Sequence, residues 1–429
     1  MNLPTYMAVL GAALLYIVAR ERIRITISAT LLIMLWVLYG VGYFYFASGA
    51  DEWTHVSDRL TLALAVMWVS LVAGMELGRV VAGRAAVYQL AVVRIWDFSS
   101  VEGHGRRLEL FPLVVAWAIA AILIAVFLAL DRPAHISQFL AASNELETSD
   151  LRLNYSATGS YAFDVLLAVF APFVCCYLFV MWLSRRGLID GLTFLALAVS
   201  ITLSEFATLH KLPWVLFLLQ LLIAHRLVRS ITPKVWHTVL AIGFAIGAVG
   251  IAASLALPEI DLQGIASYLL YRSAYVTNEG LYQTFYVYPD FLPHTNGYNI
   301  GLIQSVFGRG HYEPAQSVVA AFFGAPDATF NAMFIADAWV DFGFAGVAFM
   351  SVVVGLVVKL CDCFYFSFGK SAACIAGLST ALYGVLELLS TAAPTAFLSG
   401  GLVLLPATLM FLRIVRDLLS RTSNTLSAA

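Results

Sequence analysis

The sequence predicts an all-α protein that crosses a membrane many times. Of its 429 residues, 61% are hydrophobic and only 12% are charged, whereas a soluble domain is about half apolar and a quarter charged. The mean hydropathy is +0.87. Apolar runs recur along the whole chain, and a run of roughly 20 such residues suits a helix that crosses about 30 Å of hydrocarbon. The composition therefore excludes an ordinary water-soluble globule.

Eleven apolar runs have the composition of membrane-spanning helices. They are residues 4–19, 26–46, 60–78, 110–130, 161–184, 191–208, 212–225, 235–256, 333–358, 371–391 and 395–414. The two runs on either side of Leu212 are short and suit half-buried or broken helices. The first run has neither a basic segment before it nor a small-residue cleavage site, so we expect a retained helix and not a signal peptide.

The positions of lysine and arginine predict the orientation of these spans, because cytoplasmic loops keep most of them. With eleven spans, an outer N-terminus and a cytoplasmic C-terminus, most of the 24 lysines and arginines are cytoplasmic. The exceptions are Arg59, Arg132, Arg152, Lys211, Arg272 and Arg309. The bias holds in every loop and therefore supports the number of spans as well as their direction.

Two long connections stand out within a single integral membrane domain, residues 1–429. The outer segment 257–332 is far longer than a typical connection, and it is too rich in aromatic and apolar residues to be disordered. We expect short helices there, packed on the outer membrane face. The cytoplasmic segment 79–108 contains residues 85–96, whose apolar residues recur at helical spacing beside arginines, as in an interfacial helix.

Charge and cysteine content exclude several classes of function. The formal net charge of -2 offers no basic surface for nucleic acid. The five cysteines lie in or beside apolar segments, which indicates neither a disulfide framework nor a zinc site. The usual metal-binding spacings are missing from the sequence, so we expect no metal and no cofactor.

Cations outside the cytoplasm are functional candidates, because the positive-inside bias acts against them. Arg59, Arg132 and Arg152 each lie within two residues of an aspartate and are expected to form local ion pairs. Lys211, between the two short runs, either attracts an anion in an outward-opening cavity or extends to the headgroups or to Glu205.

Arg272 and Arg309 belong to the outer segment. Arg272 shares a helix face with Glu279 and either links to that carboxylate or binds a ligand. Arg309 lies between two glycines, which permit close approach of a ligand, and its planar guanidinium suits phosphate oxygens. A plain glycine turn that carries an arginine is the alternative. His311 follows directly after this turn.

The same segment is rich in tyrosine, with Tyr271, Tyr275 and Tyr282 as candidates for sugar binding. Amphipathic rings also suit the headgroup region, and the rings alone do not separate the two roles. His294 is interpreted as an ordinary loop residue.

The ninth span begins with two carboxylates. Asp337 and Asp341 are four residues apart and share one helix face near the outer boundary. They could bind a cation, act as a base and its partner, or point at water. Glu76, in an apolar run, is expected to be paired or to lie near an interface.

The stretch from Asn331 to Gly355 contains Phe-Ile-Ala-Asp-Ala-Trp-Val-Asp-Phe-Gly-Phe-Ala-Gly-Val and continues as an apolar span. It resembles the segment after the large outer loop of bacterial oligosaccharide repeat-unit polymerases, the Wzy-type O-antigen polymerases. The His210-Lys211-Leu-Pro element and the Tyr271-Arg272 start of the large loop are also similar to that family. The resemblance extends over residues 190–360 and the hydropathy of the whole chain.

The resemblance implies a GT-C-type glycosyltransferase of the bacterial inner membrane that contributes to lipopolysaccharide biosynthesis. Such an enzyme transfers a growing glycan from undecaprenyl pyrophosphate to the non-reducing end of a new lipid-linked repeat unit. Its partners are the lipid-linked donor and acceptor, membrane lipids and a chain-length regulator.

In this interpretation the cations and carboxylates acquire roles. Lys211, Arg272 and Arg309 would stabilise the charge of the leaving pyrophosphate. His311 ranks first as general base, followed by Asp337 and Glu279.

Other functions remain open at this point. An O-antigen ligase would use the same donor with a lipid A core acceptor, and the segment from Asp337 to Gly346 favours the polymerase over it. A polysaccharide or lipid transporter is disfavoured because the sequence shows no inverted repeat. A non-catalytic partner in envelope assembly would have no clear use for unpaired outer cations.

Overall fold

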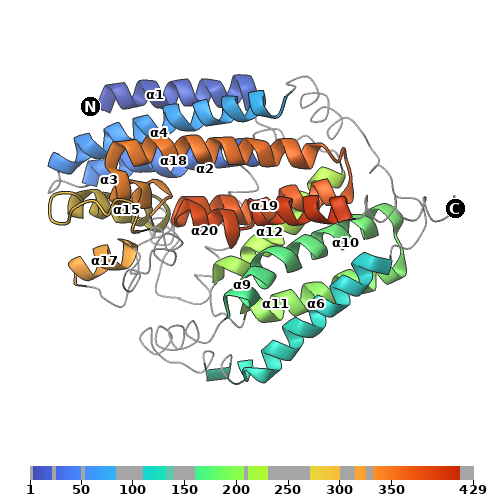
Figure 1. Ribbon diagram of the computed structural model, residues 1–429. Coiled ribbons are helices and arrows are strands. Elements are labelled where there is room, and N and C mark those ends of the chain that lie inside the picture. Colours follow the sequence, from blue (N-terminus) through green and yellow to red (C-terminus); the bar gives the residue numbers. More distant parts are fainter. Residues whose placement is uncertain are drawn as a thin grey trace, which may run out of the picture. The chain divides into compact units, whose positions relative to one another are not determined.

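The computed structural model describes residues 3–21, 26–49, 54–83, 110–132, 134, 137–138, 160–206, 211–229, 271–299, 315–324 and 332–415. Within these ranges every regular element is a helix and no strand occurs (Figure 1). This agrees with the predicted all-α class.

Seven helices in the described part are long and apolar enough to cross a membrane. They are Ile27–Ala47, Val56–Val81, Leu110–Ala129, Tyr161–Arg185, Leu188–Glu205, Ile335–Phe366 and Ala372–Ser390. Each overlaps one of the predicted spans. Val215–Val228 and Leu404–Val415 are shorter apolar helices. The protein is therefore a polytopic α-helical chain of membrane-protein type.

The remaining predicted spans differ from expectation or lie outside the described residues. The first corresponds to α1 (Leu3–Tyr16), which continues as a π-helical turn. The prediction of one helix over 395–414 is wrong, because α20 (Ala393–Leu398) ends before Gly401, whose φ of +77° interrupts the helix. Residues 235–256 and the predicted interfacial helix 85–96 lie outside the described part.

The chain divides into two compact units, each described by itself. In the second unit, α10 (Ala171–Arg185) packs against α11 (Leu188–Phe206) and α12 (Lys211–Val228), and α6 (Leu110–Ala129) packs on α10 and α11. Leu123, Cys175 and Ile201 lie in the shared apolar core.

The first unit contains three helices that carry the features of functional interest. They are α1, α4 (Thr54–Val81) and α18 (Ile335–Phe366), which lie side by side in Figure 1. Around them are α2 (Ile27–Leu35), α3 (Gly42–Gly49), α15 (Val276–Val287) and α17 (Ala315–Phe322). Helices α15 and α17 are the short helices observed in the predicted segment 257–332. Helix α15 packs on α3 and α4.

Helices α4 and α18 approach each other at backbone distance through glycines. A Cβ added at Gly74 would lie 2.2 Å from the Val352 carbonyl oxygen, and one at Gly355 would lie 2.2 Å from the Leu71 carbonyl oxygen. A Cβ at Gly78 would lie 2.9 Å from the Lys359 side chain. Small residues four apart allow such close contacts between membrane helices, where van der Waals packing drives association.

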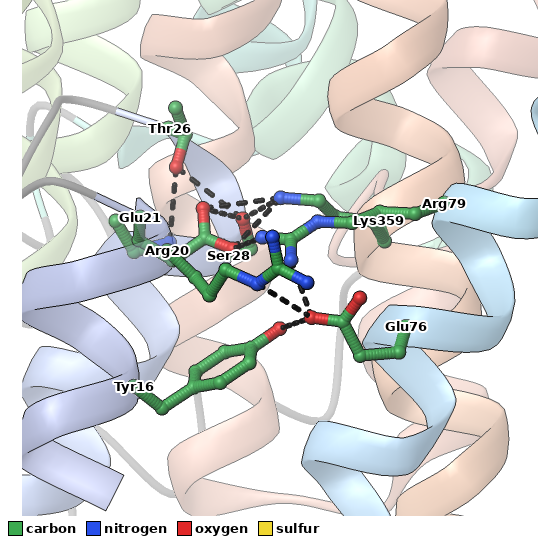
Figure 2. Close-up of polar contacts among 9 residues, drawn as sticks. Tyr16, Arg20, Glu21, Thr26, Ser28, Glu76, Arg79 and Lys359 are labelled. Atoms are coloured by element: carbon green, nitrogen blue, oxygen red, sulfur yellow. Dashed lines mark hydrogen bonds and ion pairs between the residues drawn. The ribbon is translucent and has the colours of Figure 1, made fainter. Parts of the chain in front are cut away.

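A group of charged residues joins α1, α4 and α18 at one end (Figure 2). We call Glu21, Glu76, Arg79 and Lys359 the ion cluster. The Lys359 ammonium donates to both carboxylate oxygens of Glu21, at 2.9 and 3.0 Å. Arg79 bonds to Glu21 and to Glu76, and the Tyr16 hydroxyl donates to Glu76 at 2.8 Å. The expectation that Glu76 is paired is therefore confirmed.

Lys359 corrects a detail of the predicted topology. The sequence assigned it to a cytoplasmic loop after a span that ends at 358, but α18 continues to Phe366 and the Lys359 side chain is fully buried. The Ser28 hydroxyl also lies 3.1 Å from the ammonium. A buried charge is tolerated because opposite charges and hydrogen bonds replace water.

Helices α1, α4 and α18 run in the same direction. Each reaches the ion cluster near its C-terminal part, through Glu21 just after α1, Arg79 on α4 and Lys359 on α18. The first, third and ninth spans of the predicted topology must likewise run in one direction. After the bend of α18 at Phe342 and Gly343, Phe344 and Lys359 are 15 residues apart, or ~22 Å along a helix.

We expect Gly355→Leu to destabilise the protein because its side chain has no space against the α4 backbone. Overpacking of this kind costs about 1–3 kcal/mol. Thermal unfolding of the detergent-solubilised protein measures the change. Gly11→Leu on α1 is the control, since no atom lies within 4 Å of a Cβ there. Equal melting temperatures for the two variants would contradict the glycine contact.

Lys359→Met should also destabilise the chain, because it leaves the buried Glu21 carboxylate with one cation fewer. Breaking a buried pair costs about 3–5 kcal/mol, and we expect the lower end because Arg79 still contacts Glu21. Arg20→Met is the matched control. Its side chain is 60% exposed and lies 3.8 Å from Glu76, so its loss should cost at most about 1 kcal/mol. A chemical denaturation series compares them, and an equal loss for both would contradict the prediction.

Candidate functional site

The candidate site forms where α18 bends near its beginning. Phe342 and Gly343 depart from helical geometry, with φ/ψ of -138°/15° and 58°/-140°. A positive φ of this kind favours glycine. Past the bend, a Cβ at Gly346 would lie 2.0 Å from the Ala338 carbonyl oxygen. The two parts of α18 therefore touch at backbone distance, and glycine is required at both positions.

The bend frees backbone carbonyls that would accept hydrogen bonds from N–H groups of the same helix if it were unbroken. The Val340 carbonyl accepts from the Thr295 N–H at 3.0 Å and from His294 Nδ1 at 3.2 Å, and the Asp341 carbonyl accepts from the Asn296 N–H at 3.0 Å. Unpaired carbonyls at a helix end require such partners. The bend therefore creates the docking place for the loop.

The Asp341 side chain holds the same loop. Its Oδ1 accepts from the Thr295 hydroxyl and from the N–H groups of Gly297 and Asn299, each of the latter at 3.1 Å. We call Asp341 together with residues 294–299 the loop clamp. Asp341 is 2% exposed, so the interpretation that it points at water is wrong. Hydrogen bonds to a charged acceptor are the stronger kind.

Asp337 lies one turn earlier and is partly exposed. Its Oδ1 accepts from Asn299 Nδ2 at 2.6 Å, and its Oδ2 accepts from Gln316 Nε2 at 3.3 Å. Asn299 Oδ1 in turn accepts from the Ala315 N–H at the start of α17, at 3.0 Å. Asn299 thus connects Asp337, the loop clamp and α17, and it fixes the orientation of the Asp337 carboxylate.

Aromatic rings form the base of the site. The Trp339 indole stacks on Phe285 of α15 at 4.2 Å and donates to the Tyr288 carbonyl at 2.9 Å. His294 and Phe344 both meet Trp339 edge-on, with centroids 5.6 and 5.0 Å away. Trp339 is buried, whereas Phe344 is partly open. The imidazole therefore lies against a buried aromatic ring.

Arg59 has a partner other than the one expected from its position. It was predicted to form a local ion pair beside Asp58, but its guanidinium makes two bonds of 3.1 Å to the Asp290 carboxylate. It also donates to the Phe285 carbonyl at 3.3 Å. This pair links the beginning of α4 to the end of α15 and to the loop that leads to His294.

The predicted sugar-binding tyrosines occupy different environments. Tyr271 is exposed and stacks on Tyr275 at 5.1 Å, while Tyr275 also packs on Phe46. Tyr282 is 3% exposed and contacts Phe46 at 5.3 Å. Tyr282 therefore contributes to packing, and Tyr271 is the most open of the three.

The predicted base Glu279 lies in the first turn of α15 and is half-buried. Burial raises its pKa above the ordinary value for a glutamate, which favours a protonated carboxyl.

Four predicted residues receive no structural test. Arg309 and His311 lie outside the described residues. Lys211 begins α12 and Arg272 lies in a π-helical turn, Tyr271–Tyr275, but the placement of neither side chain is described. The carboxylates Asp337 and Asp341 both bond to Asn299, and Tyr271 stacks on Tyr275. Within the described ranges, no group of three or more His, Cys, Asp or Glu side chains could hold a metal ion.

Asn299 was not among the predicted site residues, and His294 was interpreted as an ordinary loop residue. Both contact α18 residues about 40 positions later, so no local spacing revealed them. The available signal was the His-Thr-Asn-Gly-Tyr-Asn stretch, residues 294–299, whose Asn-Gly pair favours a turn. Asn296 and Gly297 indeed have positive φ.

Asp341→Leu should release the loop clamp, because three donors then lose their acceptor. We expect faster hydrogen exchange at the Gly297 and Asn299 amides, by tenfold or more for each 1.4 kcal/mol lost. Asp341→Asn keeps an oxygen in place and should have a smaller effect. Amides of α10 serve as the internal control. Unchanged exchange at the two loop amides in Asp341→Leu would contradict the clamp.

No protein-family model, no curated protein and no solved structure matches this chain. An assignment of function therefore depends on the residues of the chain itself.

Proposed function

We propose that the protein is a membrane glycosyltransferase that polymerises lipid-linked oligosaccharide repeat units. It would transfer the growing glycan from undecaprenyl pyrophosphate to the non-reducing end of a new repeat unit. The observation that carries the proposal is the partly exposed Asp337 carboxylate, oriented by Asn299 and Gln316 at the bend of α18. It belongs to the stretch of sequence that resembles Wzy-type polymerases.

The surroundings of Asp337 suit a saccharide. Phe342 and Phe344, on either side of Gly343, are 49% and 37% exposed. Open aromatic rings offer apolar faces to sugars, and the neighbouring amide and imidazole groups offer hydrogen bonds. Such a combination of apolar faces and a few fixed polar groups is typical of ligand sites.

The location fits chemistry outside the cytoplasm. In the predicted topology α18 begins at the outer face, and the ion cluster lies at its cytoplasmic end. A lipid-linked donor presents its pyrophosphate at the membrane surface, and charge develops there as the glycan leaves. Lys211, Arg272 and Arg309 are proposed to stabilise that charge, and Asp337, Glu279 and His311 are the acids and bases that the sequence offers.

The test is polymerisation by the purified protein. It is incubated with lipid-pyrophosphate-linked repeat units of several sugar compositions, and the products are separated by size. We expect a ladder of longer glycans. Arg272→Ala and Arg309→Ala should each lower its rate by about 10²–10³-fold, the usual loss for one donor to a developing oxyanion.

Arg413→Ala is the matched control, since Arg413 contacts Phe368 in the other compact unit. We expect it to retain the wild-type rate. Transfer of glycan to added lipid A core without a ladder would replace the polymerase by an O-antigen ligase. Absence of both products with every substrate would overturn the proposal that the protein is a glycosyltransferase.

A further inference from the structure

His294 has a defined tautomer. Its Nδ1 lies 3.2 Å from the Val340 carbonyl oxygen. A carbonyl oxygen only accepts hydrogen bonds, so Nδ1 must carry the proton in the neutral ring. Nε2 then carries a lone pair and can only accept. The bend of α18, which releases the Val340 carbonyl, thereby determines which nitrogen of the imidazole is basic.

The surroundings of Nε2 leave that lone pair available. Among the described residues, no hydrogen bond to Nε2 is made, and the ring is partly exposed. A Cβ added at Gly343 would lie 3.3 Å from Nε2. Glycine at this position therefore keeps a side chain away from the basic nitrogen. Trp339, edge-on to the ring, limits its rotation.

Asp337 is held by two neighbouring amides. Both of its oxygens already accept amide N–H groups, from Asn299 and Gln316. Its position suits the binding of a sugar hydroxyl or the stabilisation of positive charge.

We propose that His294 is the general base of the site and accepts the proton of the attacking saccharide hydroxyl on Nε2. This inference rests on the proposed glycosyltransferase function. In the step, the hydroxyl oxygen forms a bond to the anomeric carbon of the growing glycan. The bond from that carbon to the pyrophosphate oxygen breaks, and the pyrophosphate keeps the electron pair. The hydroxyl proton passes to Nε2.

The test compares two substitutions at one position. In His294→Asn the side-chain amide can still donate to the Val340 carbonyl, but no basic nitrogen remains. We expect the rate of ladder formation to fall by about 10²–10⁴-fold, with hydrogen exchange of the loop amides unchanged. His294→Ala should lower the rate of ladder formation to the same extent and should also increase the hydrogen exchange of the loop amides. His225→Asn, a half-buried histidine on α12, is the control and should keep the wild-type rate.

The pair of substitutions separates a base from a positioning residue. If His294→Asn retains the wild-type rate while His294→Ala loses activity, the histidine only positions the loop and the inference is wrong. A wild-type protein that forms neither a ladder nor a ligation product would instead overturn the proposed function, and this role with it.

Discussion

The close contact between α4 and α18 is the interaction on which the first unit depends. Gly74 and Gly355 bring the two backbones together, and each helix carries polar groups at both ends. At one end, Arg59 of α4 binds Asp290, while α18 carries the loop clamp. At the other end, Arg79 and Lys359 meet on Glu21. A larger residue at either glycine would push α4 and α18 apart. The helix ends that carry Arg59 and the loop clamp would then separate together with the ends that carry Arg79 and Lys359, because packed helices move as rigid elements.

The ion cluster and the loop clamp compensate in two ways for the lost hydration of a charged group. Each contains a charge near the end of an apolar helix, where other groups must replace water. The ion cluster does so with opposite charges, since Lys359 lies between two oxygens of Glu21. The loop clamp does so with backbone N–H groups around Asp341. The first arrangement ties three helices together, whereas the second holds a loop and leaves Asp337 accessible.

The spans were predictable because hydropathy is a local property. The predicted runs 110–130 and 371–391 agree with Leu110–Ala129 and Ala372–Ser390 to within a few residues. The sequence placed Lys359 in a loop because a lone lysine resembles the end of a span, and only the fold reveals its partner Glu21, 338 residues earlier. The break before Gly401 was missed for a related reason. That glycine packs on Val169, and its role depends on a contact far away in sequence.

The site was predictable only in part, and the physical reason is the bend. The spacing of Asp337 and Asp341 located the correct turn of α18, but a regular helix would have satisfied the Val340 carbonyl itself and left nothing for His294. Irregular backbone at the depth of a membrane persists only where other groups pair with it. The loop 294–299 supplies those groups, so the bend and the loop each require the other. Gly343 makes the bend possible, the bend presents the carbonyl, and the carbonyl orients the imidazole. The orientation of the imidazole therefore depends on a conformation that one glycine permits.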